Sequence, residues 1–286
     1  MMNAALASAR ADTLRLRRWP TVWVLSGIWV LLNLMFVYVF RYLSYRNGSG
    51  PAAGDGTPRA ELLAGVLPDR VAIAVVQGLP MFGGAIVLTI GALAAGSGYG
   101  WGTWKTALTQ GPSRLSVAGG TVISMAGLVL AMLAVTFVVD LGVASALAMV
   151  EGQPLGLPAI GPLAKAIGAG ILVAGMWALA GVAIGTFTRS PALAVGVGVV
   201  WVLAIENLLR GVASLLSWLD PVADVLPGTA AGSLVEAVGA TPVGEGGSPG
   251  VVTNLAGWPA AAVTVGYLLA FLVLTGFLVR RRDIAG

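Results

Sequence analysis

The sequence predicts an all-α, polytopic membrane protein with six transmembrane helices and an N-terminal amphipathic interfacial helix. Hydrophobic residues make up 57% of the 286 residues and charged residues only 10%, whereas soluble proteins carry roughly 25% charged residues. Crossing about 30 Å of hydrocarbon takes about 20 apolar residues in a helix, and runs of this length recur along the chain. They cover residues 21–42, 71–96, 117–148, 164–187, 191–212 and 257–279.

The segment before the first span carries leucines among small and basic residues over 4–18. This pattern predicts a short helix that lies on the inner membrane surface, and Pro20 is expected to break it before the span. The run 21–42 is too long for the apolar core of a cleaved signal peptide, and no small-residue cleavage site follows Phe40. We therefore expect a retained first helix.

Two polar segments rich in glycine and proline, 44–70 and 213–256, are expected to form external loops. Within the second, short helices are expected at 212–219 and 229–238. Because six spans of about 22 residues use about half of the chain and leave no room for a second catalytic domain, 1–286 is expected to be a single transmembrane domain.

Glycines and a proline inside the spans predict local features of the helices. Gly78 and Pro80 predict a kink in the second span. Gly181 and Gly185 form a GxxxG pair in the fourth span, which indicates close helix packing within the bundle rather than a specific dimer contact.

Basic residues are distributed unequally between the two sides of a six-span chain. With six crossings, both termini, the 97–116 segment and the 188–190 turn share one side. That side holds ten basic residues: Arg10, Arg15, Arg17, Arg18, Lys105, Arg114, Arg189, Arg280, Arg281 and Arg282. The other side holds six, over much longer loops: Arg41, Arg46, Arg59, Arg70, Lys165 and Arg210. The positive-inside rule therefore predicts that both termini are cytoplasmic.

The composition excludes several kinds of chemistry. The chain has no cysteine and no histidine, which removes disulfides, thiolate chemistry, and the commonest metal ligand and general base. No G-x-x-x-x-G-K-[ST] phosphate loop occurs, so we expect no ATP hydrolysis by this chain itself. The net charge of +4 comes largely from basic clusters beside spans, which indicates contact with anionic membrane lipids and not with nucleic acid.

Residues 97–116, SGYGWGTWKTALTQGPSRLS, are too polar to span a membrane and combine aromatic, basic and glycine residues. With the basic, aromatic LRLRRWPTVW before the first span and RRRDI at the end, this segment resembles the six-helix permease subunits of bacterial ABC type-2 exporters. The residues that match the segment after the second span in that family are Gly102, Thr103, Lys105, Leu108, Pro112, Ser113 and Arg114. The acidic residue that usually precedes them is absent here.

The resemblance implies that 97–116 is a cytoplasmic coupling segment that docks on a separate ATPase. It also implies a multi-pass protein of the bacterial inner membrane, exporting a substrate that is amphiphilic: a drug, an antibiotic or a lipid-like molecule. The implied assembly is a dimer of permease chains, identical or different, with a dimer of ABC ATPase subunits that bind the ATP and magnesium. The residues implied or expected in the coupling contact are Trp101, Gly102, Thr103, Trp104, Lys105, Leu108, Pro112 and Arg114.

Three charged residues inside the spans are further candidates. Asp140 lies deep in the third run, where an ionised carboxylate costs about 2.5 kcal/mol or more. Two interpretations stand equally: a substrate-path or gating residue, or a hydrogen-bonded carboxyl near the outer end of a long helix. Glu206 and Arg210 are four residues apart, and a local ion pair explains them more simply than a direct substrate role.

Two other functional classes remain as alternatives. An ATPase-independent secondary transporter or channel needs the same architecture, but the chain shows no inverted halves with paired broken helices. A membrane enzyme is disfavoured by the absence of histidine and cysteine and of a paired acidic motif in the spans. Co-purification of a soluble P-loop ATPase would distinguish an exporter permease from both.

The topology gives the first test. Alkaline phosphatase fused after Arg282 should be inactive, because the enzyme folds actively only outside the cytoplasm and the basic residues predict a cytoplasmic C-terminus. Strong phosphatase activity of this fusion, measured in intact cells, would exclude the six-span topology.

Overall fold

The computed structural model describes residues 2–50, 52, 58–100, 102–109, 111–213 and 215–281, and every regular element in these ranges is a helix. Six helical stretches are long and apolar enough to span a membrane, which confirms the predicted six-span, all-α fold. They are Pro20–Asn47, Pro68–Gly100, Arg114–Val150, Ile160–Thr188, Pro191–Ala213 and Gly257–Arg281.

Short π-helical and 3₁₀ turns interrupt or connect these stretches. The elements in chain order are α1 (Met2–Arg18), α2 (Pro20–Leu34), η1 (Met35–Val39), α3 (Phe40–Asn47), α4 (Arg59–Ala64), η2 (Pro68–Arg70), α5 (Val71–Gln77), η3 (Leu79–Gly83), α6 (Gly84–Gly100), α7 (Thr103–Thr109), α8 (Arg114–Val150), α9 (Ile160–Thr188), α10 (Pro191–Val200), η4 (Trp201–Ile205), α11 (Glu206–Ala213), η5 (Ser217–Leu219), α12 (Asp220–Asp224), α13 (Pro227–Ala237), η6 (Val243–Glu245) and α14 (Gly257–Arg281).

Local sequence accounts for several helix boundaries. Pro20, Pro191 and Pro227 stand at the first position of their helices, where the missing N–H removes no hydrogen bond. The kink expected from Gly78 and Pro80 is a π-helical turn, η3, in which the Gly83 N–H donates to the Gly78 carbonyl at 3.0 Å. The ring of Pro80 disfavours the regular helical path, so the chain gains one residue in this turn.

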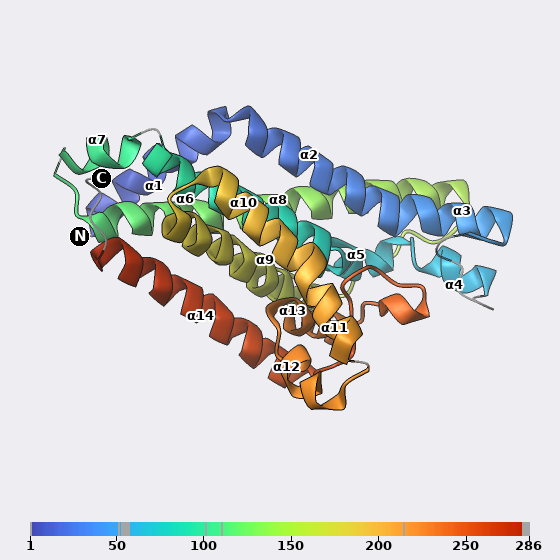
Figure 1. The fold of residues 1–286 in the computed structure, drawn as a ribbon. Coiled ribbons are helices and arrows are strands. Elements are labelled where there is room, and N and C mark those ends of the chain that lie inside the picture. Colours follow the sequence, from blue (N-terminus) through green and yellow to red (C-terminus); the bar gives the residue numbers. More distant parts are fainter. Residues whose placement is uncertain are drawn as a thin grey trace.

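The centre of the bundle is formed by the second and fourth spans, which are the most buried, with α6 and α9 in the most extensive contact. Small residues allow this close approach. A Cβ atom at Gly181 would collide with the Leu88 carbonyl, and one at Gly185 would press on the Ala92 carbonyl. The expected packing within the bundle is thus confirmed, and α2 and α14 lie on opposite sides of this centre (Figure 1).

Both ends of the chain lie at one end of the bundle, together with α1 and α7 (Figure 1). The opposite end, called here the distal end, carries α3, α4 and the segments α11 to α13. The loop 44–70 contains a short helix, α4, that was not expected, and the region 213–256 contains α12 and α13; of the helix expected at 212–219, only the 3₁₀ turn η5 at Ser217–Leu219 forms within 215–219. Helix α13 matches the helix expected at 229–238, and its residues Pro227 to Val235 are buried under the neighbouring spans.

The contact between α6 and α9 can be tested by adding one methyl group. Gly181→Ala should lower the free energy of unfolding by about 1–3 kcal/mol, because the backbone of α6 cannot move away without loss of packing. Gly196→Ala on α10 is the matched control, since no atom lies within 4 Å of its added Cβ, and it should be neutral or stabilising by up to about 1 kcal/mol. Equal stability of the two variants in detergent would contradict this packing.

Candidate functional site

The residues expected to act in coupling are held at the end of the bundle that carries the termini. Helix α7 joins α6 to α8, and Trp104 on it is only 6% exposed. Its indole stacks on Tyr99 with ring centres 5.4 Å apart and packs in a cluster with Ala118 and Val279. Trp104 is therefore packed into the bundle end and does not face lipid.

The rest of this segment agrees with the local expectations. Helix α7 ends at Thr109, and α8 begins after Pro112 with Ser113 as its cap, whose hydroxyl accepts from the Ser116 N–H at 3.2 Å. Thr106 is exposed and Leu108 is half-buried. Trp101 and the side chains of Thr103 and Lys105 lie outside the described residues; Gly102 precedes α7, and Arg114 begins α8.

Asp140, on α8, is completely buried in the distal half of the bundle, where α8 faces α2. The Asn33 amide donates to its Oδ1 at 2.8 Å, and the Tyr38 hydroxyl donates to its backbone carbonyl at 3.2 Å. One turn away, the Trp29 indole N–H donates to the Thr136 hydroxyl at 2.8 Å. Asp140 thus faces the protein interior, and Asp140 Oδ2 and Asn33 Oδ1 have no hydrogen-bond partner.

Glu206 is also buried in the distal half, at the start of α11, and its hydrogen-bond partners differ from the expected Arg210. The Trp201 indole N–H donates to its Oε1 at 2.7 Å, and the Gly228 backbone N–H at the start of α13 donates to the carboxylate. A Cβ at position 228 would collide with Glu206 Oε2, so a side chain there would displace the carboxylate from its present position. A carboxylate at this position also interacts favourably with the positive end of the α13 dipole.

Arg210 does not form the expected ion pair with Glu206. Among the described residues, the ion pairs within 4 Å are Arg15–Asp12 and Arg46–Glu151. Arg210 Nη2 instead donates to Asn207 Oδ1 at 2.7 Å, and its Nη1 is buried without a partner. The spacing of four residues placed the two charges on one face, but the indole and the helix N-terminus provide closer partners for the acid.

Arg210 lines a cavity of about 530 Å³ at the distal end. The wall also includes Met81 of η3, Asp220 and Asp224 of α12, and Asn254, whose amide donates to Asp224 at 2.8 Å. The cavity therefore combines an apolar wall with groups of both charges, which suits an amphiphilic ligand.

Three π-helical turns connect these buried groups. Tyr38 belongs to η1, and Trp201 belongs to η4. Between them, Phe36 of η1 stacks on Phe82 of η3 at 5.2 Å, and η3 packs against α13. Since π-helical turns are frequent at functional sites, the distal half of the bundle is the strongest candidate site for a ligand.

At the distal mouth of the bundle, Glu151 accepts hydrogen bonds from the hydroxyls of Tyr42 at 2.7 Å and Tyr45 at 2.9 Å. These hydrogen bonds lower the pKa of the Glu151 carboxyl below its ordinary value, with a further contribution from Arg46 at 3.6 Å. This cluster ties α3 to the end of α8.

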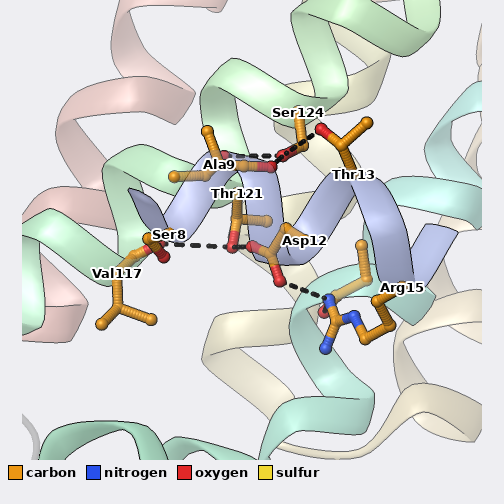
Figure 2. A network of polar contacts seen from close by, with 10 residues as sticks. Ser8, Ala9, Asp12, Thr13, Arg15, Val117, Thr121 and Ser124 are labelled. Atoms are coloured by element: carbon orange, nitrogen blue, oxygen red, sulfur yellow. Dashed lines mark hydrogen bonds and ion pairs between the residues drawn. The ribbon is translucent and has the colours of Figure 1, made fainter. Parts of the chain in front are cut away.

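A second polar network joins α1 to the start of α8 (Figure 2). The Thr121 hydroxyl donates to Asp12 at 2.7 Å, Asp12 pairs with Arg15 at 3.3 Å, and Arg15 donates to the Ala94 carbonyl of α6 at 2.9 Å. The Ser124 hydroxyl is 3.0 Å from the Ala9 carbonyl. This network fixes α1 along α8.

The sequence did not identify the partners of three residues. These are Asn33 for Asp140, Trp201 for Glu206 and Asp12 for Thr121. Asn33 carried a usable signal, because a lone amide in an apolar run needs a buried hydrogen-bond partner in a membrane. Within the described residues, no group of three or more aspartates and glutamates is arranged to hold a metal ion.

Double-mutant cycles distinguish the two possible partners of Glu206. Glu206→Met and Trp201→Phe should be coupled by about 1 kcal/mol, because either substitution alone removes the same hydrogen bond. Glu206→Met and Arg210→Met should be coupled less strongly, because Glu206 and Arg210 form no ion pair within 4 Å. The measurement is the free energy of unfolding in micelles, and stronger coupling to Arg210 than to Trp201 would restore the ion-pair interpretation.

A comparison with protein-family models finds no match to this chain. A search of curated proteins finds no match either. The fold and the spans establish a six-span, multi-pass helical membrane protein.

Proposed function

We propose that this chain is the permease subunit of an ATP-driven ABC type-2 exporter, which moves an amphiphilic substrate outward across the bacterial inner membrane. The observation that carries the proposal is α7, a short helix between the second and third spans at the end that holds both termini. The sequence around α7 is the part that resembles the coupling segment of that family. A separate ATPase supplies ATP hydrolysis, and a second permease chain completes the channel.

The contacts of α7 suit a coupling element. Through Trp104 it touches Tyr99 at the end of α6, Ala118 at the start of α8 and Val279 at the end of α14. The Arg189 guanidinium, directly after α9, lies 5.9 Å from the centre of the same Tyr99 ring. A displacement of α7 by a partner would therefore reach the ends of four spans at once, since packed helices move as rigid bodies.

The distal cavity is the proposed substrate site. It lies between α11, α12 and the loop before α14, and it is lined by Arg210 and Asp224 as well as by Met81. Movement of α6 or α10 would change its shape, because η3 and η4 connect these helices to the residues around it. A cavity of this mixed character binds the polar and apolar parts of an amphiphile together.

The buried carboxyls favour one alternative, an ATPase-independent secondary transporter. Asp140 and Glu206 lie within spans, where ionisable groups commonly serve ion or proton pathways. Transport in vesicles that contain this chain and its ATPase decides between the two functions. The exporter requires ATP inside the compartment that holds the ATPase, whereas the alternative requires only an ion gradient and no second subunit.

The first step of that experiment is isolation of the tagged chain from its native membranes. We expect a P-loop ATPase to co-purify and its ATP hydrolysis to be stimulated by amphiphilic substrates. Transport that runs on a proton gradient in vesicles holding this chain alone would contradict the proposal.

The coupling role of α7 is tested by charge reversal. Lys105→Glu with Arg114→Glu should leave membrane insertion intact but weaken ATPase binding about tenfold or more, because the new carboxylates would repel the acidic residues that the two cations are expected to meet on the ATPase. The matched control is Arg10→Glu with Arg280→Glu, two exposed cations at the same end of the bundle. Binding of the isolated ATPase that is unchanged in the first variant, or equally weakened in the control, would show that α7 is not the contact.

A further inference from the structure

A groove with a volume of about 640 Å³ lies between α1, α2 and α8, on the side of the bundle remote from the distal cavity. Helices α1 and α8 are in close contact, and α2, which leaves α1 at Trp19 and Pro20, is in much less extensive contact with α8. The groove closes where the Trp29 indole reaches Thr136. Two glycines of its wall, Gly27 and Gly127, have no atom within 4 Å of an added Cβ, so the space beside them is open.

The length of the groove corresponds to one leaflet of a bilayer. Along α8 it extends from Ser124 to Val135, eleven residues further, or about 16 Å at 1.5 Å per residue. This is roughly half of the ~30 Å hydrocarbon core. The leaflet is the one on the side of the termini, because the groove begins beside α1.

The groove is polar at one end and apolar at the other. Thr13, Arg17 and Ser124 line the end near α1, whereas Val30, Ala131 and Val135 line the far end. Trp23 also lines it, and its indole N–H donates to the Arg17 carbonyl at 2.8 Å. Tryptophan is enriched at the headgroup level of membranes, which places the polar end of the groove at that level.

Arg17 carries the charge that selects the occupant. Its side chain is exposed and takes part in none of the ion pairs of the described residues, whereas its neighbour Arg15 is bound to Asp12 and to the Ala94 carbonyl (Figure 2). Arg10 and Arg18 on the same helix are also exposed. The mouth of the groove therefore attracts an anion, and its depth accepts a hydrocarbon chain.

We propose that the groove binds an anionic phospholipid of the leaflet on the side of the termini. One acyl chain lies between α2 and α8, and the phosphate contacts Arg17. The inference is independent of the proposed transport function, because it depends only on the groove and on the basic face of α1. A bound lipid would fill the gap between α2 and α8 and so support the position of the first span.

Native mass spectrometry of the full chain, purified in mild detergent, tests the headgroup contact at Arg17 and the acyl-chain contact between α2 and α8 separately. The probes are phosphatidylglycerol and phosphatidylcholine with identical acyl chains. We expect one phosphatidylglycerol to be retained in preference to phosphatidylcholine. Arg17→Gln should weaken phosphatidylglycerol binding about tenfold, because it removes a hydrogen bond to a charged group, and should abolish the preference. Arg10→Gln, with the same loss of charge outside the groove, should keep the preference.

The acyl-chain part is tested by Gly127→Leu, which places a side chain in the groove at a position where an added Cβ has no atom within 4 Å. Retention of both lipids should fall about tenfold or more. Gly142→Leu, on the same helix but outside the groove and also in open space, should bind both lipids as the unchanged chain does.

Three results would overturn the proposal. Equal effects of Arg17→Gln and Arg10→Gln would show that Arg17 holds no headgroup. Unchanged lipid retention in Gly127→Leu would show that the chain does not enter the groove. Conversion of a dimer to a monomer by Gly127→Leu, with lipid binding unaffected, would show that the groove receives a second copy of this protein.

Discussion

Polar contacts between the N-terminal arm (residues 2–47) and α8 determine the arrangement of the whole bundle. Inside hydrocarbon each polar side chain needs a partner within the protein, and each such hydrogen bond contributes about 0.6–2 kcal/mol. Five contacts join residues separated by 107 to 109 positions: Ser8 with Val117, Asp12 with Thr121, Trp29 with Thr136, Asn33 with Asp140, and Tyr42 with Glu151. These nearly constant separations mean that the arm and α8 run parallel, with the same register at both ends.

Several features follow from this parallel register. A parallel arm brings α1 and the start of α8 to the same end, beside α7 and the C-terminus. The arm packs closely on α8 along α1, diverges between Trp19 and Trp29, and reaches α8 again through side-chain hydrogen bonds from Trp29 onward, which leaves the groove in the half near the termini. The fully buried acid, Asp140, lies instead where α2 meets α8 again, next to the π-helical turn η1. The apolar groove and the polar distal half are thus two consequences of one helix pair.

The sequence predicted the spans, the kink near Pro80 and the glycine packing of α9, because length, hydropathy and local backbone chemistry determine these features. It also predicted a helix before the first span, which forms as α1. It failed for Glu206 because one partner is the backbone N–H of Gly228 on α13 and the other, Trp201, lies five residues earlier, across the π-helical turn η4. Residue spacing on a helix face indicates which side chains are neighbours, but not whether the N-terminus of α13 or an indole lies closer. The register between the arm and α8 could not be predicted either, because a single sequence does not show which helices lie side by side.

The register between the arm and α8 can be measured directly by disulfide cross-linking, because the chain contains no cysteine of its own. The Cβ of Ala5 lies 3.9 Å from a Cβ placed on Gly119, close to the mean separation of about 3.8 Å in disulfides. Ala5→Cys with Gly119→Cys should therefore cross-link in native membranes under mild oxidation, as detected by a mobility shift that a reductant reverses. Ala5→Cys with Gly127→Cys, about 12 Å further along α8, should not. Efficient cross-linking of the second pair, or none in the first, would contradict the parallel register.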